Sequence, residues 1–204
     1  MITIIDYGLG NIKAFVNLYK RLNIKTLVAH TAADLKDATK IILPGVGAFD
    51  YAMSQLNSSG MRDELDNQVI ANKVPILGIC VGMQILAKSS DEGKLPGLGW
   101  IDGEVKLFDS NSIPYKTRLP HMGWNSINPM KKNKLLEGIC INYRFYFLHS
   151  YYFACNNSDD IIATTGYGVT YASAINHDNI FGTQFHPEKS HSNGIQLLHN
   201  FASL

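Results

Sequence analysis

Short apolar runs and segments with helical periodicity alternate through the first half of the chain. The apolar runs are bounded by glycine, proline or polar residues and have the length of buried strands. Between them, apolar residues recur at helical spacing, as in Ile12, Phe15, Val16 and Tyr19. The predicted strands are residues 2–5, 24–29, 41–43 and 75–79, and the predicted helices are residues 12–19, 32–37 (with Thr31 as N-cap), 48–55 and 61–72, with a further helix beginning at Val81 or Gly82. Strands that alternate with helices favour a parallel sheet covered on both faces.

The second half has a different character, because strand-like segments follow one another with little helix between them. These segments are residues 100–108, 144–153, 161–165, 171–176 and 180–185, and residues 177–179 predict a hairpin turn between the last two. Ser192 is expected to cap a closing helix that carries Ile195, Leu198 and Phe201 or Ala202. The pattern predicts one α/β domain over residues 1–204, with a central, mainly parallel sheet flanked by helices and extra antiparallel strands in the second half.

Composition narrows the classes of protein that this pattern allows. The chain has 204 residues, of which 46% are hydrophobic and 17% charged, as is typical of a folded globular protein. The net charge of +1 offers no basic excess for nucleic acid or for an anionic membrane. The longest apolar runs are too short to span a bilayer, and the N-terminal segment reads as a strand rather than a secretory signal. We therefore expect a cytoplasmic protein.

One of the cysteines has the surroundings of a nucleophile. Cys80, Cys140 and Cys155 are too few and too widely spaced for a disulfide framework or a zinc site, and a lone cysteine is most often a small buried hydrophobe. Cys80, however, lies in Leu77-Gly78-Ile79-Cys80-Val81-Gly82-Met83-Gln84, where a predicted strand meets a predicted helix. Small neighbours permit the sharp turn that exposes a reactive side chain. A helix beginning just after Cys80 would favour the thiolate through its dipole and direct backbone N–H groups toward an oxyanion.

A thiolate nucleophile needs an acid–base partner, and His186 has the surroundings of one. It lies in Gln184-Phe185-His186-Pro187-Glu188-Lys189, where the following proline favours extended backbone at the histidine. In extended chain, residues two apart face the same side, so Glu188 is expected to reach the His186 ring and fix its tautomer. His121, His149 and His191 remain alternatives, while His30, His177 and His199 have the pattern of surface or helix-face residues.

Two glycine-containing turns are weaker signals. Pro44-Gly45-Val46-Gly47 ends a predicted strand and has a flexible backbone that could present an N–H group to an oxyanion. Tyr7-Gly8-Leu9-Gly10-Asn11 lacks the third glycine and the distant acidic residue of a dinucleotide-binding fingerprint. The second turn therefore gives no support to nucleotide binding.

Taken together, these segments resemble a known family. Gly78-Ile79-Cys80-Val81-Gly82-Met83-Gln84 with His186-Pro187-Glu188 is similar to the class I, triad-type glutamine amidotransferases. Residues 6–11, 44–47, 120–125, 146–151 and 189–190 are in addition similar to the glutaminase subunits of imidazole glycerol phosphate synthases. The resemblance runs from the first predicted strand to the last predicted helix.

The resemblance implies a flavodoxin-like amidotransferase fold, an enzyme that needs no metal or organic cofactor, and a heterodimer with a cyclase of the (β/α)8-barrel type. Carried over by position, Cys80 is the nucleophile, His186 the acid–base and Glu188 its orienting carboxylate. The other implied roles are the oxyanion region (Gly47 and Val81, with Gly45 and Val46 as an adjustable loop), glutamine binding (Gln84, Glu92, His149, Ser150 and Tyr151) and the partner-facing side (Asn11, His121, Trp124 and Lys189).

Three alternatives remain open at this point. Some members of the same family supply ammonia to a partner that acts on a nucleotide-sugar in surface-polysaccharide synthesis, and residues 21–24 and 99–102 resemble that branch. An independent thiol hydrolase would share the scaffold, but it leaves Gln84 and Glu92 without an explanation. A non-enzymatic scaffold subunit would be favoured only if a triad residue were missing, and all three are present.

Overall fold

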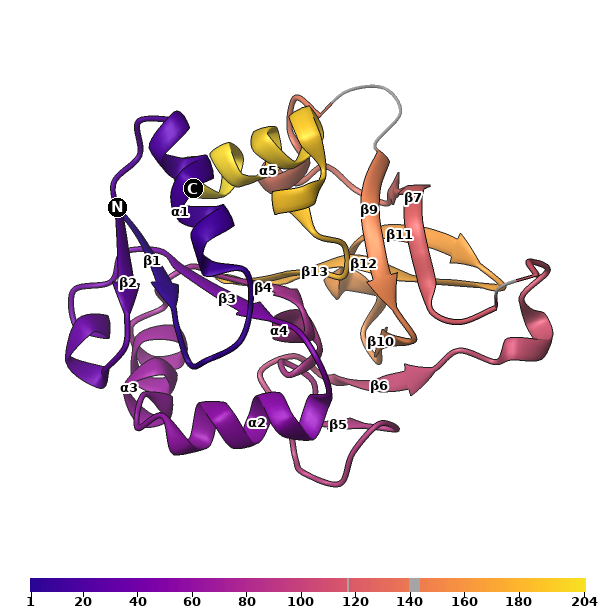
Figure 1. Cartoon of the computed structure of the whole chain (residues 1–204), viewed down its shortest axis with the longest axis horizontal. Coiled ribbons are helices and arrows are strands. Elements are labelled where there is room, and N and C mark those ends of the chain that lie inside the picture. The colour runs from indigo at the N-terminus through magenta and orange to yellow at the C-terminus, as the bar shows by residue number, and fades with distance from the viewer. Residues whose placement is uncertain (117, 140–143) are drawn as a thin grey trace.

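The computed structural model describes residues 1–116, 118–139 and 144–204 of the chain (Figure 1). Its α-helices are α1 (Ile12–Arg21), α2 (Phe49–Ser58), α3 (Arg62–Asp66), α4 (Val81–Gln84) and α5 (His191–Ser203). A π-helical turn covers Asn67–Ala71, and 3₁₀ turns cover Ala32–Leu35, Ser110–Ser112, Lys134–Leu136, Ser158–Asp160 and Pro187–Lys189. The predicted helices at residues 12–19 and 48–55 are confirmed, and the helix predicted over residues 61–72 is present as α3 and the π-helical turn. The short helix predicted over residues 32–37 is a 3₁₀ turn over Ala32–Leu35, and the helix predicted to begin at Val81 or Gly82 is α4. Among the helices of the described ranges, none has the length and apolar character needed to cross a bilayer.

The centre of the fold is a run of parallel strands. In spatial order these are β2 (Thr26–Ala29), β1 (Ile2–Ile5), β3 (Ile41–Gly45), β4 (Ile76–Cys80) and β13 (Ile180–Thr183), and each neighbouring pair is parallel. This is the strand order of flavodoxin-like sheets. Figure 1 shows α1 and α5 on one side of these strands and α2 and α3 on the other. Because both faces are covered, β1, β3, β4 and β13 are buried at every position.

Antiparallel strands extend this sheet beyond β13, as predicted. They are β12 (Val169–His177), β10 (Tyr151–Cys155) and β6 (Gly103–Leu107), followed by the short β5 (Ser89–Ser90), which is parallel to β6. Two further strands, β11 (Ile161–Tyr167) and β8 (Asn128–Pro129), pair beside β12. The predicted hairpin is confirmed, since His177 of β12 pairs with Ile180 of β13.

A separate two-stranded sheet corrects one prediction. The single strand predicted over residues 144–153 is divided at Ser150 into β9 (Arg144–His149) and β10. β9 pairs with β7 (His121–Ser126), which the hydrophobic pattern did not predict, whereas β10 joins the main sheet. The chain therefore changes sheets at Ser150, a break that alternation of polar and apolar residues does not encode because both halves alternate.

The start of the closing helix is a second correction. Ser192 was expected at the N-cap, but α5 begins at His191 and Ser190 precedes it. The Ser190 hydroxyl donates to the His186 carbonyl at 2.6 Å and accepts from the Tyr146 amide at 3.0 Å. Ser190 thus links the start of α5 to β9 and to the segment that carries His186, instead of capping the helix with its side chain.

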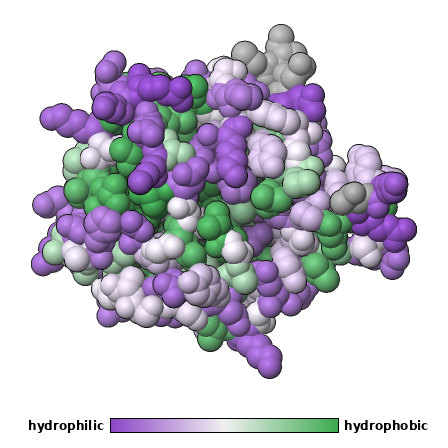
Figure 2. Space-filling view, in the orientation of Figure 1, coloured by the Kyte–Doolittle hydropathy of each residue, from purple (hydrophilic) through white to green (hydrophobic). Residues whose placement is uncertain are grey.

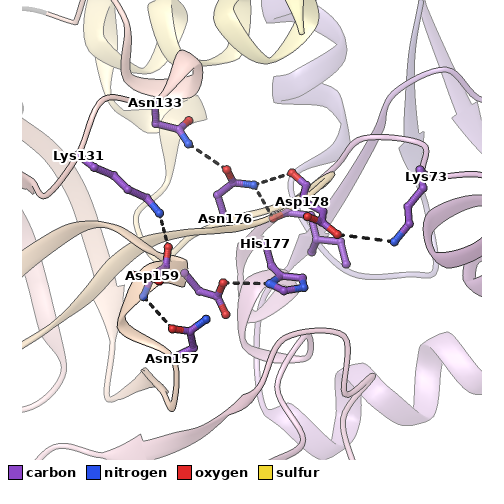
Figure 3. A network of polar contacts seen from close by, with 10 residues as sticks. Lys73, Lys131, Asn133, Asn157, Asp159, Asn176, His177 and Asp178 are labelled. Atoms are coloured by element: carbon purple, nitrogen blue, oxygen red, sulfur yellow. Dashed lines mark hydrogen bonds and ion pairs between the residues drawn. The ribbon is translucent and has the colours of Figure 1, made fainter.

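The turn of the β12–β13 hairpin lies where the parallel strands begin, at the edge of the sheet opposite to their carboxyl ends. Figure 3 shows the polar contacts around this turn. Asn133 donates from its side-chain nitrogen to Asn176 Oδ1 at 3.0 Å, and His177 Nδ1 lies 2.9 Å from Asp160 Oδ1. These contacts tie the hairpin to two neighbouring loops. They fix the beginning of β13, whose other end leads directly to the segment around His186.

Candidate active site

A cavity of about 310 Å³ lies where β3, β4 and β13 end. Because these strands are parallel, their carboxyl ends meet at one edge of the sheet, which is where such sheets bind ligands. The lining residues are Val46, Gly47, Cys80, Val81, Gln84, Glu92, Pro120, Leu148, His149, Ser150, Tyr151, His186 and Lys189. The structure therefore brings together the residues predicted for the nucleophile, its base, the oxyanion region and glutamine binding.

Cys80 occupies a sharp turn between β4 and α4. Its backbone has φ 56° and ψ −113°, an unusual conformation for a residue with a side chain. The flanking glycines allow this turn to form, because a Cβ on Gly82 would lie 1.9 Å from the Leu43 carbonyl oxygen. A Cβ on Gly78 would similarly come within 2.6 Å of the Gly82 carbonyl oxygen. The strand–turn–helix geometry predicted for a nucleophile at this position is present.

The helix after Cys80 is shorter than the thiolate argument assumed. α4 spans only Val81–Gln84, a single turn, so little dipole accumulates along it. It ends because the carbonyl oxygens of Ile85, Leu86 and Ala87 accept hydrogen bonds from the backbone of residues 98–101 rather than from a next helical turn. Stabilisation of a thiolate at Cys80 must therefore come mainly from side chains around the sulfur.

His186 and Glu188 form the expected pair beside Cys80. His186 Nδ1 lies 3.0 Å from Glu188 Oε1, and the two side chains are 5% and 3% exposed. His186 is extended, with φ −99° and ψ 94°, but Glu188 reaches the ring from a 3₁₀ turn (Pro187–Lys189) and not from continued extended chain. The other carboxylate oxygen, Oε2, is buried without a hydrogen-bond partner within the described residues. The carboxylate is thus committed to the His186 ring.

The surroundings of His186 favour its charged form. Burial of the ring acts to lower its pKa, but hydrogen bonds with Cys80 and Glu188, together with their negative charges, outweigh burial and raise the pKa from 6.5 to about 10. An imidazolium held against a sulfur atom favours the thiolate form of that sulfur. His186 therefore provides the stabilisation that the single turn of α4 cannot.

The residues predicted to bind glutamine all line the cavity, and hydrogen bonds within the protein hold Gln84 and Glu92 in place. Gln84 donates from Nε2 to the Tyr151 carbonyl at 3.0 Å and to Gln184 Oε1 at 3.1 Å. Glu92 Oε2 accepts from the Phe49 amide at 2.8 Å and so holds the start of α2 next to the Val46–Gly47 loop. These contacts use only part of each side chain. One acceptor oxygen on Gln84 and one on Glu92 carry no hydrogen bond from the described protein.

The residues predicted to face a partner divide into two groups. Asn11, Trp124 and Lys189 are exposed, with Trp124 retaining 40% of its surface. His121 is only 3% exposed, so its side chain points into the protein, although it lies on the same strand as the exposed Trp124. Its ring is stacked between Phe147 and Tyr167, because the β7 residues that face away from solvent pack into an aromatic cluster.

Three buried residues near the site had no predicted role. Tyr7 donates its hydroxyl to the Pro44 carbonyl at 2.7 Å, and burial and the nearby Cys80 raise its pKa. Tyr171 contacts both His121 and His149 through its hydroxyl. Gln184 is fully buried, and its Nε2 lies 3.8 Å from the Cys80 sulfur. Gln184 was within reach of the sequence argument, because it precedes His186 by two positions in extended chain and so faces the same side.

The two histidines of this cluster give the protein a predicted sensitivity to acid. Burial lowers the pKa of His149 from 6.5 to about 3 and that of His121 from 6.5 to about 4, so both rings are neutral when folded and become protonated near 6.5 when unfolded. Unfolding then takes up protons at lower pH. We expect the free energy of unfolding to fall by about 1.4 kcal/mol per pH unit for each ring as the pH drops below the pKa that histidine has in the unfolded chain.

Urea titrations from about pH 7 to about pH 5 measure this loss of stability. Replacing His121 with glutamine removes one titrating ring and should reduce the dependence on pH. A free energy of unfolding that stays constant over this range would contradict the prediction.

Comparisons with known proteins agree over the whole chain. The family model described as glutamine amidotransferase class-I matches residues 3–203. The imidazole glycerol phosphate synthase subunit HisH of Bdellovibrio bacteriovorus is 56% identical, and that of Leptospira interrogans is 54% identical, with 100% of each chain covered in both cases. The protein named subunit HisH 2 from Pseudomonas aeruginosa is 45% identical with the same coverage.

Solved structures agree with the fold. A crystal structure of a glutamine amidotransferase matches with a TM-score of 0.77 at 18% identity, covering 100% of this chain and 98% of that one. A chain of PurLQS from Thermotoga maritima matches with a TM-score of 0.73 at 16% identity, covering 99% of this chain and 97% of that one. With a cysteine at a strand–helix turn, a histidine–carboxylate pair beside it and a family model matched over almost its entire length, this chain belongs to the class I glutamine amidotransferases.

Proposed function

We propose that this chain is the glutaminase subunit of an imidazole glycerol phosphate synthase, which hydrolyses glutamine and passes ammonia to a cyclase subunit in histidine biosynthesis. The observation that carries this proposal is the meeting of Cys80 and His186 at one cavity, with Glu188 held against the His186 ring. Full-length relatives that carry the name of this subunit, at 45–56% identity, support the choice of pathway. The chain acts as one glutaminase domain in the cytoplasm.

The proposed reaction begins with the Cys80 thiolate and the His186 imidazolium. The sulfur attacks the side-chain carbonyl carbon of glutamine, and the carbonyl oxygen takes the negative charge. When this intermediate collapses, the C–N bond breaks and His186 gives its proton to the departing ammonia. Neutral His186 then takes a proton from water, the hydroxide attacks the thioester carbon, and the C–S bond breaks to release glutamate. The thiolate and imidazolium are restored, and these steps call for no metal or organic cofactor.

Backbone groups at two loops are proposed to stabilise the oxyanion. Val81 follows the nucleophile directly, Gly47 lies just after the end of β3, and both residues line the cavity. The amide N–H groups of these residues are proposed to donate to the oxygen as its charge develops. One such donor contributes on the order of 10²–10³ in rate.

The polarity of the cavity wall suggests how glutamine is held. Both N–H groups of Gln84 are already used by Tyr151 and Gln184, so its Oε1 can only accept a hydrogen bond from the substrate. Glu92 similarly has one carboxylate oxygen left for the substrate ammonium group. His149, Ser150 and Tyr151 form the far wall of the proposed glutamine pocket.

The outward face of the β7–β9 sheet is the proposed docking site for the cyclase, a (β/α)8-barrel. It carries large apolar side chains that remain exposed, at 62% for Met122, 40% for Trp124 and 38% for Leu148. Leu148 also lines the cavity, as does Lys189, whose Nζ lies 5.6 Å from the centre of the Tyr146 ring. A partner seated here would seal the cavity and keep ammonia from solvent. Figure 2 shows that apolar surface on the face it depicts is divided into several patches by hydrophilic side chains.

Removing the charge of Glu188 tests the proposed triad. Glu188→Gln keeps the size of the side chain but loses the carboxylate that holds His186 Nδ1 at 3.0 Å. We expect turnover to fall by about 10–10²-fold. This is less than the 10²–10⁴-fold that acid–base catalysis typically contributes, because His186 itself remains in place. Glutamine binding should stay close to that of the parent, because Glu188 does not line the cavity. Steady-state kinetics separate the two effects, and a Glu188→Ala protein as active as the parent would rule out the orienting role.

The proposed pathway is tested by the acceptor that stimulates glutamine hydrolysis. The chain is mixed with the cyclase subunit from the same source, and glutamate release is measured without acceptor, with the imidazole-precursor nucleotide and with a nucleotide-sugar. Stimulation by the nucleotide supports the proposal. Stimulation by the nucleotide-sugar alone would assign the same chemistry to surface-polysaccharide synthesis.

A further inference from the structure

The side-chain amide of Gln184 has no part in the reaction described above, yet it lies against the reactive sulfur. Gln184 is 0% exposed and follows β13, directly before Phe185 and His186. Its Nε2 lies 3.8 Å from Cys80 Sγ, and its Oε1 accepts from Gln84 Nε2 at 3.1 Å. Burying a primary amide is costly unless it is hydrogen-bonded, so both ends of this group need a defined partner.

The direction of the Gln184 amide follows from a backbone carbonyl two steps away. The Tyr151 carbonyl lies 3.0 Å from the Gln84 side chain, and a carbonyl oxygen can only accept a hydrogen bond. The nitrogen of Gln84 must therefore point toward Tyr151, and the same nitrogen faces Gln184. Gln184 must then present its oxygen to Gln84. The nitrogen of the Gln184 amide therefore faces Cys80 and can donate an N–H to its sulfur.

A second arm of hydrogen bonds holds the same carbonyl from the other side. His149 Nδ1 lies 2.8 Å from the Tyr151 carbonyl and must donate to it, which leaves His149 Nε2 as an acceptor for the Tyr171 hydroxyl at 3.2 Å. That hydroxyl then accepts from His121 Nδ1 at 3.1 Å. His121 Nε2 in turn accepts from Asn125 Nδ2, whose nitrogen is directed by the Gly166 carbonyl. This arm requires neutral rings, and burial lowers the pKa of both histidines.

We propose that Gln184 donates a hydrogen bond to the Cys80 thiolate, with the direction of its amide imposed by the Tyr151 carbonyl through Gln84. The donor would stabilise the sulfur whenever it carries charge, both as attacking thiolate and as leaving group from the thioester. When sulfur is neutral in the thioester, the same contact is weak, so Gln184 would act selectively on the charged states. This inference depends on the proposed function only in taking Cys80 as the nucleophile.

Other groups around the sulfur set the background against which Gln184 acts. The titratable side chains near Cys80 are His186 with Glu188 behind it, Tyr7, His149, Tyr151, Glu92 and Lys189. His186 supplies the positive charge, whereas Gln184 supplies a neutral donor whose strength does not change with pH. Loss of Gln184 should therefore make the Cys80 sulfur less reactive toward an electrophile at a given pH, while His186 keeps it reactive overall.

The test is the pH dependence of Cys80 alkylation by iodoacetamide, followed by mass spectrometry of the Cys80 peptide. Gln184→Met has a similar length but no donor, and we expect it to raise the pH midpoint of alkylation by about one unit, which is about tenfold slower labelling below the midpoint. Gln184→Glu keeps an acceptor for Gln84 but places an anion near the sulfur, so it should raise the midpoint at least as far. It also provides a second readout if Gln184→Met folds poorly.

Gln68→Met is the matched control. Gln68 is also a buried glutamine, 5% exposed and hydrogen-bonded to Glu64 and Lys36, but it lies in the π-helical turn and does not line the cavity. It should leave the alkylation midpoint of Cys80 unchanged while changing stability. An unchanged midpoint in both Gln184 variants would overturn the proposal. Alkylation needs no glutamine, so this test is independent of glutaminase activity. If the midpoint shifts but the parent protein does not hydrolyse glutamine, the proposed function is wrong and the hydrogen bond from Gln184 to Cys80 is still supported.

Discussion

Replacing Cys80 with alanine is expected to lower glutamine hydrolysis by at least ~10³-fold, the scale found when a triad nucleophile is removed. The sulfur is the atom toward which the site converges. His186 lines the same cavity, Gln184 Nε2 lies 3.8 Å away, and the glycines around Cys80 permit the turn that exposes the sulfur to the cavity. The measurement is glutamate release by Cys80→Ala and by the parent at saturating glutamine, both in the presence of the partner subunit.

Cys155 is the matched control for this substitution. It is half-buried, and burial together with the nearby Asp160 raises its pKa to about 12, which leaves it a thiol at neutral pH. Cys155→Ala should therefore retain the parent's activity, and a glutamine-analogue electrophile should label Cys80 alone. We expect Cys140 to be dispensable as well, although it lies outside the residues that the structure describes. Labelling of Cys155 or Cys140 with parallel loss of activity would move the site elsewhere.

The parts of this site that the sequence predicted are those whose geometry depends on near neighbours. Cys80 could be recognised because the flanking glycines determine the turn locally, and His186 because Pro187 restricts its backbone. The expected contact between His186 and Glu188 is present at 3.0 Å, although a 3₁₀ turn delivers it. Side chains two positions apart can meet in extended chain or in a 3₁₀ turn. The predicted contact is therefore present although the backbone after His186 is not extended as expected.

The parts that the sequence could not predict depend on segments far apart in the chain. The single turn of α4 ends because residues 98–101 take its carbonyl groups, and nothing near Val81 signals that competition. The burial of His121 arises from aromatic packing with Phe147 and Tyr167, which come from other strands. An alternating pattern likewise gives no sign that the chain changes sheets at Ser150. Each of these features is decided by tertiary contacts rather than by local propensity.

The isolated chain is expected to be a poor glutaminase. Its rate should be about 10²–10³-fold lower than that of the chain bound to a partner carrying its acceptor substrate, because one hydrogen-bond donor to the oxyanion contributes about this factor. The argument concerns the loop Pro44–Gly47 at the end of β3. Gly47 has φ +91°, and Val46 beside it is 42% exposed, so this segment is held by few contacts of its own. One conformation of the loop would direct a carbonyl into the cavity and another an N–H group. Partner binding would then act by shifting the population between them.

Gly47→Ala tests whether this residue is the hinge. A Cβ at Gly47 would have no atom within 4 Å, so the substitution adds no clash and acts only through the backbone. Alanine disfavours positive φ by about 1–2 kcal/mol, which corresponds to about a 5–30-fold change in population. If φ +91° belongs to the resting state, the substitution should raise glutamine hydrolysis by the isolated chain by about this factor and leave the stimulated rate nearly unchanged.

Gly60→Ala provides the control for backbone strain alone. Gly60 has φ +73°, and a Cβ at this position would likewise have no atom within 4 Å, but the residue follows α2 and does not line the cavity. The variant should lose a similar amount of stability and keep the parent's ratio of stimulated to basal activity. Glutamate release is measured for the parent and both variants, alone, with the partner, and with partner plus acceptor. Equal rates in all three conditions for the parent would exclude a gate, and an unchanged ratio in Gly47→Ala would place the hinge at another residue.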